Sequence, residues 1–135
     1  MAGILSRLQN EDLSLYAERD GVLQFSSDRA GLRPLLRGVS EFPEAFENST
    51  VADRVVGLAA AYLLIHGKVK EVHAGLVSEE GRKALEEAGI ALKASEEVAD
   101  LHDDAGEGPC PMDTLARSSG GVALFVDELQ RQFAD

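Results

Sequence analysis

The stretch VADRVVGLAAAYLLIH, residues 51–66, decides the fold. It is a long apolar run with one acid and one arginine near its start. From Asp53 onward, Ala, Val, Leu and Ile occupy nearly every position, and a helix that is apolar on all sides lies in the interior of a protein. Asp53 is a suitable N-cap, since its carboxylate can accept hydrogen bonds from free backbone N–H groups. His66 and Gly67 are typical of a helix end. The stretch therefore predicts a buried helix over residues 53–66.

A β-hairpin is predicted before this helix. In LSLYAERDGVLQFSS (residues 13–27), apolar residues alternate with polar ones on either side of Asp20 and Gly21. Asp-Gly is a preferred dipeptide for the tight turn of a hairpin. We expect two antiparallel strands, at about 12–18 and 22–26.

A strand–helix–strand unit is predicted after the helix. The valine-rich segment KVKEVHAGLVS indicates a strand over 69–77, and Ser78 and Gly89 are suitable start and end residues for a helix between them. IALKAS then predicts a short strand from residue 90. This order of elements indicates an α/β domain with a mixed sheet, in which a right-handed crossover joins the last two strands.

Three arginines recur at a spacing of four in the segment after the hairpin. They are Arg29, Arg33 and Arg37, and Pro34 fits the first turn of a short helix there. Residues four apart lie on one face of a helix. Two interpretations remain open: a solvated polar face, or an edge that contacts anions in an otherwise acidic protein.

The last third of the chain predicts a loop followed by two helices. Residues 96–112 are rich in Asp, Glu, Gly and Pro without periodicity, which is typical of a loop. Pro111 can start a short helix that extends to Arg117. Residues 121–135 predict an amphipathic helix that docks on the domain or on a second subunit. With no internal repeat, the 135 residues are interpreted as a single domain.

Composition restricts the classes of partner. The chain has 24 acidic and 13 basic residues and a formal charge of −11. Such a surface repels nucleic acid and anionic membranes. One cysteine, Cys110, cannot form an internal disulfide, and the start of the chain lacks the pattern of a secretion signal. We expect a cytoplasmic protein that binds neither nucleic acid nor membrane.

Several blocks together resemble a known family. These blocks are DGVLQFSSDRAGLRPLL, VADRVVGLAAAYLLI, VKEVHAGLVSEEGRKALEEAGI and CPMD, and they span about residues 11–115. They resemble a small bacterial family of unknown function with a cytidine-deaminase-like fold. The resemblance implies a three-layer α/β/α sandwich with a mixed sheet, to which residues 121–135 add a C-terminal helix.

The zinc chemistry of deaminases is not expected in this chain. Such enzymes hold zinc with a His or Cys before a helix and two Cys in a P-C-x-x-C turn, beside a Glu that moves protons. By resemblance, Val51 replaces the first ligand and Asp53 replaces the Glu. The turn position falls at Ser78–Gly81, which has no thiol, and Cys110 follows a helix and a strand later. The acidic loop His102–Glu107 lacks the spacing of a calcium or iron site. We predict no metal and no cofactor.

Three functional hypotheses remain. The first is a module that binds a nucleotide-like or other anionic small molecule between helix N-termini, where free N–H groups attract anions. Its expected ligand-binding residues are Asp53, Arg54, Ser78, Glu79, Cys110 and Asp113. The second is a metal-independent enzyme with Cys110 as the nucleophile, supported by Asp53 or by His73 or His102. If Asp53 binds helix N–H groups, its pKa should be lowered, which makes it a poor base. The third is a homo-oligomer assembled through the C-terminal helix.

Overall fold

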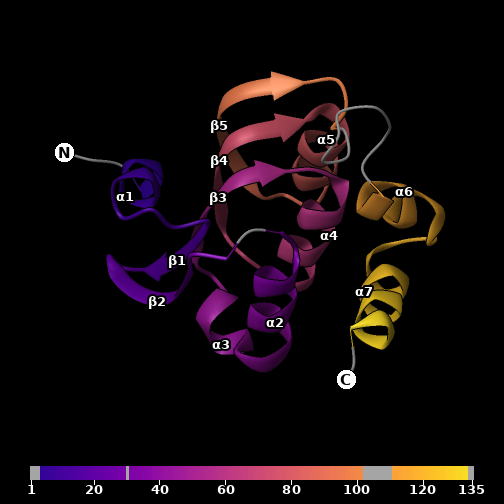
Figure 1. Ribbon diagram of the computed structural model, residues 1–135, viewed down its shortest axis with the longest axis horizontal. Coiled ribbons are helices and arrows are strands. Elements are labelled where there is room, and N and C mark those ends of the chain that lie inside the picture. Colours follow the sequence, from indigo (N-terminus) through magenta and orange to yellow (C-terminus); the bar gives the residue numbers. More distant parts are fainter. Residues whose placement is uncertain (1–3, 30, 102–110, 134–135) are drawn as a thin grey trace.

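A mixed five-stranded sheet forms the centre of the computed structural model, which describes residues 4–29, 31–101 and 111–133 (Figure 1). The strands are β1 (Leu15–Arg19), β2 (Val22–Ser27), β3 (Thr50–Val56), β4 (Glu71–Ser78) and β5 (Ala91–Val98). Their order in the sheet is β2-β1-β3-β4-β5. Strand β1 runs antiparallel to both β2 and β3, whereas β3, β4 and β5 are parallel.

Helices lie on both faces of the sheet, in unequal numbers. They are α1 (Ile4–Asn10), α2 (Arg33–Glu41), α3 (Pro43–Phe46), α4 (Leu58–His66), α5 (Glu79–Glu87), α6 (Pro111–Ser118) and α7 (Val122–Gln132). Figure 1 shows α1 on one side of the sheet and the other helices on the opposite side, with α6 and α7 outside α4. Within the described residues, no helix has both the length and the apolar composition needed to cross a bilayer.

Two hydrophobic cores correspond to the two faces. The smaller core joins Ile4 and Leu8 of α1 to Tyr16 of β1 and Ala52 of β3. The larger core contains the buried faces of α2, α4, α5 and α7 against the sheet. Helix α4 lies at its centre and contacts α2, α5, α6 and α7, which explains why α4 is apolar on nearly every side.

Most of the predicted elements are confirmed. The turn between β1 and β2 is formed by Asp20 and Gly21, both with positive φ angles. Ser78 begins α5 as its N-cap, and its hydroxyl oxygen accepts a hydrogen bond from the Gly81 N–H at 3.1 Å. Pro34 lies in the first turn of α2. The apolar stripe of α7 packs into the larger core of its own chain.

The predicted helix over 53–66 is wrong for residues 53–57 and confirmed for the rest. Residues Thr50–Val56 form β3, and the helix begins only at Leu58, after Gly57. Thr50 and the valines of this segment are β-branched and favour a strand, and a short apolar run does not distinguish a buried strand from a buried helix. Asp53 therefore lies within a strand and not at a helix N-terminus. Strand β5 also continues to Val98, into the segment that was predicted to be a loop.

Glycine at position 75 allows β3 and β4 to approach closely at the point where β4 changes the face that it buries. Val72 and Ala74 of β4 lie in the larger core, and so does Val77, although strict alternation would point Val77 to the other face. Gly75 lies at this change of side. A Cβ atom on Gly75 would lie 2.7 Å from the carbonyl oxygen of Arg54. The two backbones therefore approach at a distance that only glycine permits.

Replacing Gly75 by alanine is expected to lower the free energy of unfolding by roughly 1–3 kcal/mol, because the new methyl group must push backbone atoms apart. Urea-induced unfolding measures this change. Ser95→Ala, on exposed strand β5, is the control and should have little effect. Equal stabilities for the two variants would contradict the close approach.

Candidate functional site

Asp53 lies on the face of the sheet that carries the larger core. Its cross-strand partners are Leu15 and Ala74, both buried in that core, and directly opposed residues share a face of the sheet. The side chain itself is half-buried. Burial raises the pKa of Asp53 to about 7, and the backbone N–H groups of Val55 and Arg54 oppose the rise. The expectation of a helix-capping carboxylate with a lowered pKa is therefore wrong at this position.

The carboxylate that caps α4 comes from Asp113 of α6. Its Oδ1 atom accepts a hydrogen bond of 2.8 Å from the backbone N–H of Ala59. The N-cap residue of α4 is Gly57, which has no side chain to do this, and a Cβ atom there would lie 2.3 Å from Oδ2 of Asp113. Asp113 is 5% exposed, and burial raises its pKa while the Ala59 N–H opposes the rise. This predicted ligand-binding residue thus occupies the helix N-terminus itself.

Groups of the same chain also occupy the start of α5. Ser78 caps the helix, and Glu80 forms a two-bond ion pair with Arg117 of α6, with one nitrogen–oxygen distance of 2.7 Å. This ion pair lowers the pKa of Glu80. Glu79 pairs with Lys83 one turn later at 2.9 Å. Helix α6 therefore connects the N-termini of α4 and α5 through its own acid and its own base.

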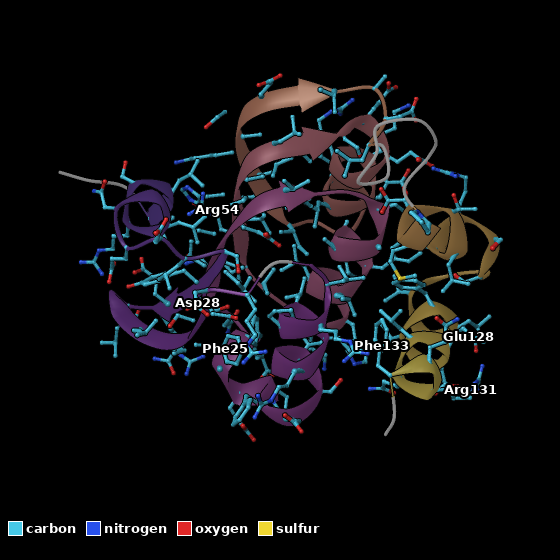
Figure 2. The ribbon with its side chains drawn as sticks, in the orientation of Figure 1. Phe25, Asp28, Arg54, Glu128, Arg131 and Phe133 are labelled. Atoms are coloured by element: carbon cyan, nitrogen blue, oxygen red, sulfur yellow. The ribbon has the colours of Figure 1, made fainter. Side chains whose placement is uncertain are left out.

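The remaining predicted residues are dispersed. Arg54 lies near α1, where its Nε atom donates to the carbonyl oxygen of Leu13 at 2.5 Å (Figure 2). His73 contacts the carboxylate of Glu71 within β4. Cys110 and His102 lie outside the described residues. The structure thus brings Ser78 and Asp113 to neighbouring helix ends, whereas Arg54 supports the junction with α1.

A groove of about 1030 Å³ lies elsewhere, between β2 with the residues after it, α2 and the end of α7. Its lining includes the three arginines singled out by their spacing and three phenylalanines, namely Arg29, Arg33, Arg37, Phe25, Phe42 and Phe133. We call it the arginine groove. Figure 2 shows Phe25 and Phe133 on either side of α2. Its volume is at the upper end of the range of small-molecule sites.

Two arginines of this groove differ from the others in their partners. Among the described residues, the side chains of Arg29 and Arg33 have no carboxylate or carbonyl partner, and Arg33 instead lies over the ring of Phe133, 4.6 Å from its centre. Every other arginine of the chain contacts a carboxylate or a carbonyl oxygen, namely Arg7, Arg19, Arg37, Arg54, Arg82, Arg117 and Arg131. Of the two interpretations of the arginine series, this pattern favours an anion-contacting edge.

Aromatic rings form the apolar part of the groove. The ring of Phe25 lies 5.3 Å from that of Phe46, which is fully buried, and 5.9 Å from that of Phe42. Phe42 is 43% exposed. Sequence reasoning missed these rings because they come from β2, the α2–α3 junction and the end of α7. The arginine spacing was the only signal in the sequence that pointed to the groove.

Removing the Asp113 cap should destabilise the fold. Asp113→Ala leaves the buried Ala59 N–H without a partner, so we expect a loss of roughly 1–2 kcal/mol in the free energy of unfolding. Chemical denaturation measures it, with Glu79→Gln as the control because that exposed ion pair contributes little. A variant as stable as the control would show that the hydrogen bond does not stabilise α4.

The raised pKa of Asp53 predicts a pH-dependent stability. An acid whose pKa rises on folding binds protons more tightly in the folded state, so its contribution is present below its ordinary pKa of 3.8 and is lost as the pH rises through about 7. Asp53→Asn lacks this titration. The melting temperature of the wild type, relative to that of the variant, should therefore fall between about pH 4 and pH 7, whereas a constant difference would contradict the shift.

Comparison with known proteins gives the family without an activity. The chain has 27% identity to a crystal structure of a DUF1893 family protein, TM1506 from Thermotoga maritima, with a TM-score of 0.81 over 98% of this chain and 92% of that one. No curated protein matches the sequence. The family model "TM1506: Domain of unknown function (DUF1893)" matches residues 3–130. The chain therefore belongs to the DUF1893 family of domains of unknown function.

Proposed function

We propose that this protein binds a small anionic molecule in the arginine groove. The observation that carries the proposal is the pair of guanidinium groups, Arg29 and Arg33, that lack an acidic partner among the described residues although the chain has 24 acidic side chains. A guanidinium group binds carboxylates and phosphates through two parallel hydrogen bonds. Two such groups in one groove are suited to a single doubly charged anion.

The location differs from the one predicted from the sequence. Helix N-termini attract anions through free N–H groups, but at α4 the carboxylate of Asp113 already accepts from Ala59, and at α5 the hydroxyl of Ser78 accepts from Gly81. A ligand at either end would compete with a hydrogen bond inside the same chain. A ligand that binds Arg29 and Arg33 would displace no hydrogen bond of this kind, so the arginine groove is the more favourable site.

We also propose that the scaffold is cytidine-deaminase-like, with zinc chemistry absent. The sheet order β2-β1-β3-β4-β5 and the helices on both faces support a three-layer arrangement. Val51, at the position expected for a zinc ligand, is fully buried in the larger core, and its side chain has no nitrogen, oxygen or sulfur atom that could bind zinc.

An alternative is metal-independent catalysis with Cys110 as the nucleophile. One observation favours it, because a pKa of about 7 would suit Asp53 to accept and donate protons at neutral pH. The nucleophile of this hypothesis lies outside the described residues, so it rests on the sequence. Binding in the arginine groove rests on geometry and is the function that we favour.

The proposal is tested by titrating the full chain with inorganic phosphate at low ionic strength, followed by NMR. The double variant Arg29→Gln/Arg33→Gln should bind at least tenfold more weakly, since each charge-assisted hydrogen bond contributes roughly 1.5–3 kcal/mol. Arg131→Gln is the matched control because Arg131 lies on α7 and pairs with Asp127 and Glu128 (Figure 2). Equal affinity in the double variant and the control, or no binding by the wild type, would contradict the proposal.

A further inference from the structure

We infer that the ligand of the arginine groove is a phosphate ester that carries a planar ring, of the size of a mononucleotide. This inference rests on the proposed function and extends it from the charge of the ligand to its chemical class. Among the described residues, the groove brings together the guanidinium groups that lack acidic partners and the exposed ring of Phe42.

The arginines can bind the phosphate end. The guanidinium carbon of Arg33 lies 4.6 Å from the centre of the Phe133 ring, a cation–π contact, and its N–H groups have no carboxylate partner among the described residues. Arg29 is exposed in the segment after β2, and its backbone N–H donates to the hydroxyl of Ser27 at 3.1 Å. Neither side chain would have to break an ion pair with a described residue to bind a phosphate.

Phe42 can bind the ring. It is the one aromatic residue with an exposed side chain among the described residues, where the other large exposed hydrophobic residues are aliphatic. Its ring packs beside that of Phe25, which in turn rests on buried Phe46. A ring supported in this way offers a planar face at little cost in side-chain entropy. Bases stack favourably on aromatic side chains whatever their identity, because every base has a planar face.

The charge of the chain favours a small ligand over a polymer. A formal charge of −11 repels a nucleic acid strand along its whole length. Only the groove offers guanidinium groups without acidic partners in the described residues, and it is bounded by α2 and the end of α7. A molecule with one phosphate group and one ring can be held within the groove alone. An oligonucleotide would extend beyond the groove, where the net negative charge of the chain repels it.

The test compares three probes on the full chain by calorimetry and NMR: adenosine 5′-monophosphate, adenosine and inorganic phosphate. The wild type should bind the nucleotide at least tenfold more tightly than either part alone. Phe42→Leu keeps an apolar side chain but removes the planar ring, so it should weaken nucleotide binding severalfold and leave phosphate binding unchanged. Arg29→Gln/Arg33→Gln should weaken both, and Arg131→Gln should change neither.

The outcomes separate this inference from the proposed function. Phosphate binding that depends on Arg29 and Arg33, with no gain from the nucleoside or no effect of Phe42→Leu, would overturn the inference and leave the anion site in place. No binding of phosphate or nucleotide would overturn both. Thermal melts of each variant confirm that the protein tested is folded.

Discussion

The architecture depends on one hydrogen bond, between the Ala59 N–H at the start of α4 and the Asp113 carboxylate. Helix α4 is buried among four other helices and has almost no polar side chain of its own. A buried helix N-terminus without acceptors is strongly unfavourable. Because Gly57 has no side chain, the acceptor must come from another element, and α6 supplies it. This requirement fixes the position of α6.

In our proposal, the same interaction also excludes a ligand from this edge of the sheet. The parallel strands β3 and β4 lead into helices whose N-termini would attract anions, and at such an edge an open α/β sheet ordinarily holds its ligand. Here Asp113, Ser78 and the Glu80–Arg117 ion pair fill that edge with groups of the chain itself. The positive charge that lacks acidic partners lies instead in the arginine groove, at Arg29 after β2 and at Arg33 in the first turn of α2.

The sequence predicted elements whose signals are local and missed those that depend on distant contacts. The Asp20-Gly21 turn and the Ser78 cap are specified within a few residues, and both are confirmed. The division of residues 50–66 into a strand and a helix was not predictable, because both are buried and the apolar run has no periodicity. Asp53 is the acid nearest in sequence to the start of the helix, whereas Asp113, which caps it, is 54 positions away from Ala59.

The same contrast between local signals and distant contacts applies to the candidate site. The spacing of Arg29, Arg33 and Arg37 was visible and raised the possibility of an anion-contacting edge. The groove around these arginines also requires two aromatic residues. Phe133 comes from the end of α7, and Phe42 is exposed at the α2–α3 junction. Neither residue carries a local signal of function, since an aromatic side chain in a helical stripe is ordinarily part of a core.

A crystal structure of the wild-type chain soaked with adenosine 5′-monophosphate tests most directly whether the helix ends are closed and the groove is open. Our account predicts the phosphate against Arg29 and Arg33, with the Asp113–Ala59 hydrogen bond intact. Density for the nucleotide at the start of α4, with the Asp113 carboxylate displaced from the Ala59 N–H, would contradict it.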